Sequence, residues 1–202
     1  MSKSDRFMKR LYKPGQFRRL LSDLMSSSGD TRRQPKDQRI SHQFSERIMM
    51  AVTEVNGCRY CSYFHTKVSL KAGLKKNEIR RILKGDFEEA PQEELAALYF
   101  AQHYAESGGK PDPNAVQCML DAYGETEAKE IIAYIRAIMI GNAWGNMFDA
   151  LRHRLSGDPV ADQSIWDEVG VIFGPFWMIP GILFERLFRG KHKEVTITDP
   201  SA

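Results

Sequence analysis

The order of apolar and polar positions predicts helices along the whole chain. Apolar residues recur three or four positions apart, which is the period of one face of an α-helix. Sustained alternation of apolar and polar residues, the pattern of a strand, is not found. The pattern predicts helices over about 40–55, 58–73, 77–85, 91–104 and 126–153, with a further start at Asp112–Pro113. We therefore expect an all-α domain over residues 40–155, with Asn77 as an N-cap and Pro91 as the first residue of its helix.

The first 39 residues differ from this domain in charge. They carry eleven Lys and Arg residues against four acidic residues, whereas residues 40–202 carry eighteen against twenty-two. Four apolar residues recur at helical spacing within this segment: Phe17, Leu20, Leu21 and Leu24. Residues 26–39 (SSSGDTRRQPKDQR) are polar and predict a linker. We interpret residues 1–39 as a basic N-terminal arm and linker on a slightly acidic body.

The C-terminal extension, residues 156–202, contains an uncharged run. Val169–Phe184 (VGVIFGPFWMIPGILF) has sixteen residues without a charge, and RLFRGKHK follows soon after. This run is shorter than the ~20 residues that cross a bilayer, and Pro175 and Pro180 interrupt it, so we do not predict a transmembrane helix. Three interpretations stay open: burial against the domain, burial in a subunit interface, and peripheral membrane contact helped by the basic residues.

Composition limits the class of protein. The chain has 202 residues, 42% of them hydrophobic and 27% charged, which fits one globular domain with extensions. Three cysteines are too few for a disulfide framework, and the charged N-terminus is not followed by an apolar run. We therefore expect a cytoplasmic protein, with membrane association as the alternative. The net charge of +3 is mild, and no nucleic-acid partner is expected.

The stretch NGCRYCSYFHT, residues 56–66, contains two of the three cysteines and a histidine. If Cys58 opens a helix, a rotation of about 100° per residue places Cys61 about 60° and His65 about 20° to the same side. The three side chains then share one stripe. Unpaired backbone N–H groups and the helix dipole favour a thiolate at this end of a helix. The cysteines are close enough to form a disulfide, and His65 can exchange a proton.

These groups are the ones that a thiol peroxidase or a dithiol oxidoreductase needs. A thiolate attacks the O–O bond and becomes a sulfenic acid, its neighbour condenses with it to a disulfide, and an external dithiol resets the pair. Two other interpretations are open. Free cysteines are often simply buried, and thiolate with imidazole suits zinc. A structural zinc site needs four ligands, however, and the remaining candidates are scattered: Cys118, His42, His103, His153 and His192.

Eleven residues separate Glu46 from the C-x-x-C-x-x-x-H motif at 58–65. This spacing resembles the signature of the alkylhydroperoxidase D-like / carboxymuconolactone decarboxylase family. The segment ERIMMAVTEVNGCRYCSYFHTKVSLKAGLKKNEIRRIL is similar to the family's helix–motif–helix unit, and EAKEIIAYIRAIMIGNAWGNMFDAL resembles its long closing helix. The resemblance covers about residues 40–155.

The resemblance implies a helical bundle of the alkylhydroperoxidase D type that assembles as a homo-oligomer. It implies that Cys61 is the attacking thiolate and Cys58 its disulfide partner, with Glu46 and His65 relaying the proton. The substrate would be a hydroperoxide or a disulfide and the reductant an external dithiol, with no organic cofactor and no metal. Helix position, in contrast, favours Cys58 as the more acidic thiol, so the order of attack stays open.

Two departures from the family pattern are visible. Tyr60 stands between the cysteines, where some peroxidase members carry a histidine, and the decarboxylase branch generally lacks the cysteine pair. Asn142 and Asn146 lie on the predicted long helix, where we expect structural hydrogen bonds. The rival hypotheses for the whole chain are a non-enzymatic helical module that docks on membranes or partner proteins, and a zinc-stabilised domain.

Overall fold

The structure, a computed structural model, describes residues 9–32 and 40–188, and in these ranges the chain is helical without any strand. The predicted all-α class is thereby confirmed. The elements follow in this order: α1 Pro14–Arg32, α2 His42–Asn56, α3 Arg59–Lys71, α4 Lys76–Ile82, the 3₁₀ turn η2 Gln92–Glu94, α5 Leu95–Glu106, α6 Pro113–Leu155, α7 Ile165–Ile172 and α8 Pro175–Phe188.

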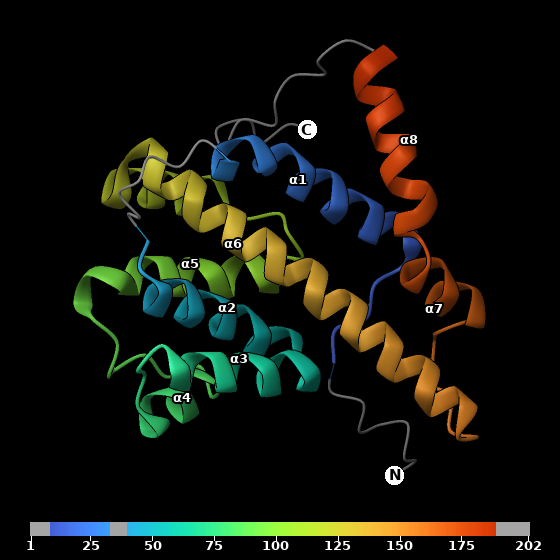
Figure 1. Cartoon of the computed structure of the whole chain (residues 1–202), viewed down its shortest axis with the longest axis horizontal. Coiled ribbons are helices and arrows are strands. Elements are labelled where there is room, and N and C mark those ends of the chain that lie inside the picture. The colour runs from blue at the N-terminus through green and yellow to red at the C-terminus, as the bar shows by residue number, and fades with distance from the viewer. Residues whose placement is uncertain (1–8, 33–39, 189–202) are drawn as a thin grey trace.

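Helix α6 is the centre of the molecule. In Figure 1 it runs diagonally across the fold, with α1 on one side and α2, α3 and α5 on the other. Its buried face includes Ile131, Ile135 and Met139, which recur every four residues and are fully enclosed. Gly124, with φ 69° and ψ 166°, breaks the helical backbone, so α6 consists of two helices, as the separate starts near residues 112 and 126 predicted.

The N-terminal segment packs into the core. Phe17, Leu20 and Leu21 are buried, and α1 lies along α6. From α6, Arg136 donates to the Ser27 hydroxyl at 2.6 Å. The predicted linker is therefore wrong for residues 26–32, which continue α1, and its remainder at 33–39 lies outside the described residues. The apolar residues at helical spacing from Phe17 to Leu24 correctly indicated a helix. This helix continues through the polar residues that follow, so the polar composition alone was misleading.

The helices of the predicted domain match the pattern with small shifts at their starts. Gly57, with φ 68°, ends α2 and separates it from α3, as Asn56–Gly57 predicted. Asn77 is not an N-cap, because α4 already begins at Lys76. Pro91 does not begin an α-helix either: its ψ of 137° is extended, and the short η2 turn stands between it and α5.

Helices α7 and α8 form a bent pair at one end of the molecule. Ser164 and Asp167 make a capping box at the start of α7. Only Glu168, Val171 and Ile172 of α7 and Met178 and Ile182 of α8 are buried, and most other apolar side chains of the pair are exposed. Within the described ranges no single helix has the length and hydropathy to cross a bilayer, although α7 and α8 taken together, with a bend of 63°, meet those criteria.

Candidate functional site

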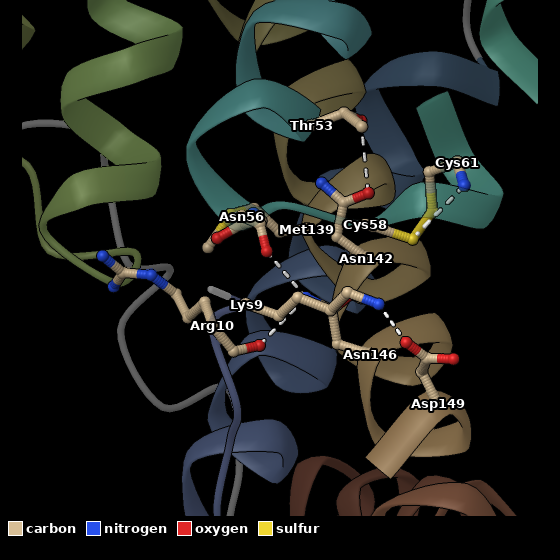
Figure 2. Close-up of a disulfide and its surroundings, with 10 residues drawn as sticks. All are labelled: Lys9, Arg10, Thr53, Asn56, Cys58, Cys61, Met139, Asn142, Asn146 and Asp149. Atoms are coloured by element: carbon tan, nitrogen blue, oxygen red, sulfur yellow. Dashed lines mark hydrogen bonds and ion pairs between the residues drawn. A yellow bond between two sulfur atoms is a disulfide. The ribbon is translucent and has the colours of Figure 1, made fainter. Parts of the chain in front are cut away.

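The two cysteines of the motif stand where α2 turns into α3. Gly57 makes the turn, and Cys58 follows it as the N-cap of α3 with extended backbone angles. Its Sγ accepts the backbone N–H of Cys61 at 3.3 Å, as a capping side chain does. The two residues form a disulfide, with their Cα atoms 5.3 Å apart (Figure 2). The predicted position of the motif at a helix start is confirmed.

The two sulfur-bearing residues differ in exposure, and α6 determines the difference. Cys58 is fully buried, whereas Cys61 is partly exposed. A β-carbon built on Gly145 of α6 would lie 2.8 Å from Sγ of Cys58 and 3.8 Å from Sγ of Cys61. Only a residue without a side chain therefore allows α6 to pass this close to the disulfide.

A buried carboxylate and an imidazole lie one helical turn beyond the disulfide. His65 Nδ1 is 2.9 Å from Oε2 of Glu46, and the two residues are 8% and 3% exposed. The Ser69 hydroxyl donates to the same carboxylate oxygen at 3.3 Å. Glu46 comes from α2 and His65 and Ser69 come from α3, so the packing of these two helices assembles the group.

His65 follows Cys61 by four residues and therefore lies on the same face of α3. In the described part of the chain no hydrogen bond joins the imidazole to either sulfur, both of which are held in the disulfide. A second histidine reaches the carboxylate from outside: Nε2 of the exposed His42 is 3.8 Å from Oε1 of Glu46. The buried carboxylate thus lies between an inner and an outer imidazole.

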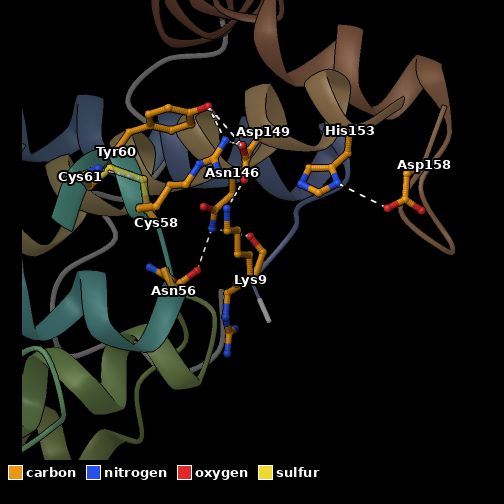
Figure 3. A network of polar contacts seen from close by, with 11 residues as sticks. Lys9, Asn56, Cys58, Tyr60, Cys61, Asn146, Asp149, His153 and Asp158 are labelled. Atoms are coloured by element: carbon orange, nitrogen blue, oxygen red, sulfur yellow. Dashed lines mark hydrogen bonds and ion pairs between the residues drawn. A yellow bond between two sulfur atoms is a disulfide. The ribbon is translucent and has the colours of Figure 1, made fainter. Parts of the chain in front are cut away.

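A charged cluster adjoins the motif on its other side. The buried Asp149 of α6 is paired with Lys9 and with Arg59, the residue directly after Cys58 (Figure 3). The Tyr60 hydroxyl donates to the same carboxylate at 3.1 Å. Burial alone would raise the pKa of Asp149, but Lys9, Arg59 and Tyr60 together hold it below its usual value. A carboxylate with two cations paired to it thus lies beside the start of α3.

The segment that precedes α1 closes the junction between α2 and α3. The Arg10 N–H donates to the Asn56 carbonyl at 3.1 Å. The Asn146 side-chain amide donates to the carbonyls of Asn56 and Arg10 at 2.7 and 3.0 Å. Thr53 donates to the side-chain oxygen of Asn142 at 3.2 Å. The predicted structural hydrogen bonding of both asparagines is thereby confirmed.

Exposed aromatic side chains surround the cysteine pair. Tyr60, Tyr63 and Phe64 project from the first turns of α3, and Phe148 of α6 meets the Tyr60 ring edge to face, with centroids 6.3 Å apart. Trp144, one turn before Phe148, donates from its indole N–H to the Ile172 carbonyl at 2.9 Å. Aromatic side chains of α3 and α6 are therefore exposed in the same region as the motif.

The other scattered candidates stay outside this site. Cys118 is a free, exposed cysteine on the first part of α6, and His103 accepts the Asp112 backbone N–H at 2.9 Å. His192 lies outside the described residues. Among the residues that the structure describes, no group of three His, Cys, Asp or Glu side chains is arranged to hold a metal ion.

The structure brings together the four residues that the sequence singled out, as two adjacent pairs: Cys58 with Cys61, and Glu46 with His65. Sequence reasoning missed Ser69, although its position four residues after His65 on the same helix was a usable signal. It also missed Gly145, Asp149 and Lys9, for which the sequence contains no local signal, because their role depends on how α6 and the N-terminal segment pack.

Part of the chain matches a protein-family model. Residues 24–102 match the carboxymuconolactone decarboxylase family. The matched segment contains both cysteines and the Glu46–His65 pair, whereas Gly145 and Asp149 lie beyond it. Neither the curated proteins nor the solved structures contain a significant match to the chain.

Proposed function

Residues 24–102 are a carboxymuconolactone decarboxylase family domain, and from this premise we propose that the protein is a thiol-dependent hydroperoxide reductase. The family has an alkylhydroperoxidase D-like helical fold, and its members are peroxidases or decarboxylases. The observation that carries the proposal is the Cys58–Cys61 disulfide at the start of α3, with the Glu46–His65 pair one turn further on. A decarboxylase has no use for a cysteine pair that closes and reopens, and a peroxidase needs one.

The two cysteines differ in exposure and in hydrogen bonding, and these differences favour a different role for each. Cys61 is partly exposed, so a hydroperoxide can reach its sulfur, whereas Cys58 is enclosed beneath α6. The buried sulfur is held by the Cys61 N–H at the positive end of α3, which stabilises its thiolate. This division favours Cys61 as the attacking residue and Cys58 as the partner that closes the disulfide.

The oxidative half-reaction uses one hydroperoxide. Cys61 passes its proton to the His65–Glu46 pair, and its thiolate attacks the terminal peroxide oxygen. The O–O bond breaks, the leaving alkoxide takes that proton from His65 to become an alcohol, and Cys61 becomes a sulfenic acid. The Cys58 sulfur then attacks the Cys61 sulfur, and the hydroxide leaves with the Cys58 proton as water. Two thiols and one hydroperoxide thus give one disulfide, one alcohol and one water.

The reductive half-reaction uses one external dithiol. Its thiolate attacks the accessible Cys61 sulfur, and Cys58 leaves as the thiolate that the helix start stabilises. The second thiol of the donor then displaces Cys61, so that the donor leaves as its own disulfide after giving two electrons to the cysteine pair, and its two protons pass to the thiolates of Cys58 and Cys61. The Cys61 thiolate takes back a proton through His65, and the pair is reset.

Thiol counting tests the proposal in a Cys118→Ser background, since Cys118 is an exposed thiol that would react by itself. The reduced protein, treated with one equivalent of cumene hydroperoxide, should lose two thiols per chain. With Cys58→Ser, Cys61 should instead accumulate as a sulfenic acid that dimedone traps. With Cys61→Ser, the remaining thiol should persist.

Turnover gives the second readout. With excess dithiothreitol as the donor, the Cys118→Ser protein should consume cumene hydroperoxide catalytically, and both cysteine variants should not. Loss of the single remaining thiol in the Cys61→Ser variant, at the rate of thiol loss in its parent, would refute the assignment of Cys61. Absence of any peroxide-dependent thiol loss in the parent would refute the proposed function itself.

A further inference from the structure

Helix α8 presents a continuous apolar face to the outside of the molecule, which we name the α8 apolar face. It consists of six exposed side chains: Phe176, Trp177, Leu183, Phe184, Leu187 and Phe188. Together with the exposed Pro180 they recur three or four residues apart, so they form one stripe along the helix. Phe176 and Leu187, near the two ends of this stripe, are 79% and 77% exposed. Trp166 of α7, at 78%, adds a further exposed aromatic side chain to the same bent pair.

The opposite face of α8 attaches the helix to the body. Met178 and Ile182 are buried, and Glu185 pairs with Arg18 of α1 at 2.6 Å. Arg186 donates to the Ser22 carbonyl of α1 at 2.8 Å. Figure 1 shows α8 meeting the body beside the start of α1 and extending away at the edge of the molecule. The helix is thus oriented by contacts on one side, and among the residues that the structure describes its apolar face is exposed.

Each carboxylate of α7 and α8 is neutralised by a cation of the body. Asp167 pairs with Lys13 at 2.8 Å, Glu168 with Arg154 at 2.8 Å, and Glu185 with Arg18. Helix α8 itself carries Arg186, and the sequence after it has Arg189, Lys191 and Lys193 against Glu194 and Asp199. Helix α1, which contacts both α7 and α8, belongs to the first 39 residues, whose sequence has eleven Lys and Arg residues against four acidic ones. Positive charge therefore adjoins the apolar face, and every carboxylate of α7 and α8 is already paired with a cation.

We propose that the α8 apolar face docks on an anionic lipid surface. Neither α7 nor α8 is long enough to span a bilayer alone, and the 63° bend between them suits insertion at the level of the headgroups. Tryptophan and phenylalanine favour this interfacial depth, and the adjoining Lys and Arg residues attract anionic headgroups. Contact with a second copy of the chain is the alternative occupant, and sedimentation equilibrium distinguishes it from lipid binding. This inference is independent of the redox chemistry at Cys58 and Cys61.

Vesicle co-sedimentation of the full chain tests the proposal. The probes are vesicles of phosphatidylcholine alone and of phosphatidylcholine with 30% phosphatidylglycerol, at low salt and in 0.5 M NaCl. The protein should bind the anionic vesicles at low salt, at least 10-fold more tightly than the neutral ones, and salt should weaken this binding. The tryptophan fluorescence should shift to shorter wavelength on binding, since Trp166 and Trp177 enter an apolar layer.

A matched pair of triple variants separates the α8 apolar face from exposed aromatic residues in general. Phe176→Ser, Phe184→Ser and Leu187→Ser together should weaken binding to anionic vesicles at least 10-fold. Tyr63→Ser, Phe64→Ser and Tyr99→Ser, all at exposed positions on α3 and α5, should leave it within about twofold. Circular dichroism shows whether each variant keeps its helical content.

Three results would overturn the proposal. The parent could stay in the supernatant with anionic vesicles, or the α8 triple variant could bind them as well as the parent does. The third result is an oligomer in sedimentation equilibrium that the α8 variant dissociates, without vesicle binding by either protein. It would make the face a contact between copies of the chain.

Discussion

Gly145 lies against the sulfur of Cys58 so closely that a β-carbon on the glycine would be 2.8 Å from that sulfur. The contact joins residues 87 positions apart, and through it α6 covers the buried half of the disulfide. Real β-carbons do not approach a heavy atom this closely, so a larger residue here must displace either α6 or the start of α3.

Gly145→Ala should therefore destabilise the protein, by about 1–3 kcal/mol, as overpacking of a core does. Gly141→Ala is the matched control on the same helix, since its β-carbon would meet only Ile138 at 3.8 Å. That change should be neutral or stabilising by up to about 1 kcal/mol, because alanine favours a helix. Urea unfolding of both variants measures the difference, and equal stability of the two would show that the contact at Cys58 is not tight.

Glu46→Gln should slow peroxide-dependent disulfide formation by about 10²-fold or more, the usual contribution of a proton-transfer group. The amide keeps the size of the side chain but cannot share a proton with His65. Glu54→Gln is the control on the same helix, since that carboxylate lies beside Gly85 and away from the site. Stopped-flow measurement of thiol loss compares the variants, and similar rates for both would remove Glu46 from the proton relay.

Asp149→Asn should lower the free energy of unfolding at pH 7 by about 1–3 kcal/mol, because it leaves Lys9 and Arg59 without their buried counter-charge. The folded protein holds the pKa of Asp149 below its ordinary 3.8, so this stabilisation is complete above that value. It is lost as the pH falls through the lowered folded value.

Urea unfolding at a series of pH values from 7 down to 3 tests this expectation. The difference in the free energy of unfolding between the parent and Asp149→Asn should be largest near neutral pH and should decrease as the pH falls below about 4. Asp158→Asn serves as the control, because the side chain of this aspartate is 40% exposed and lies 3.9 Å from His153. If this difference does not change with pH, the Asp149 side chain stabilises the protein through packing and not through its charge.

Phe17→Ala should lower the free energy of unfolding by about 3–5 kcal/mol, because the ring is fully enclosed between α1 and the rest of the core. Phe176→Ala makes the same chemical change at a position that is 79% exposed and should cost less than about 0.5 kcal/mol. Thermal unfolding distinguishes the two. Equal midpoints would mean that α1 is only loosely attached, as an N-terminal arm would be.

Local signals in the sequence predicted most of the helices, although those at Asn77 and Pro91 misplaced two helix starts. Asn56–Gly57 located the turn before Cys58, and the spacing of Cys58, Cys61 and His65 placed them along α3. The pairing of Glu46 with His65 joins two helices, and only the resemblance to a known family pointed to it. No pattern along the chain could have indicated the contacts of α6 with the disulfide, because they depend on how distant helices pack.

The family match begins at residue 24, in the middle of α1, and ends at residue 102, before α6 starts. A fragment excised at these positions would retain every cysteine and proton-transfer group of the site. It would lose Phe17 and the whole of α6, and with them the surfaces that enclose α2 and α5. Such a fragment should aggregate when it is expressed, because the ends of the family match lie inside one cooperative packing unit and the fragment would expose part of its core.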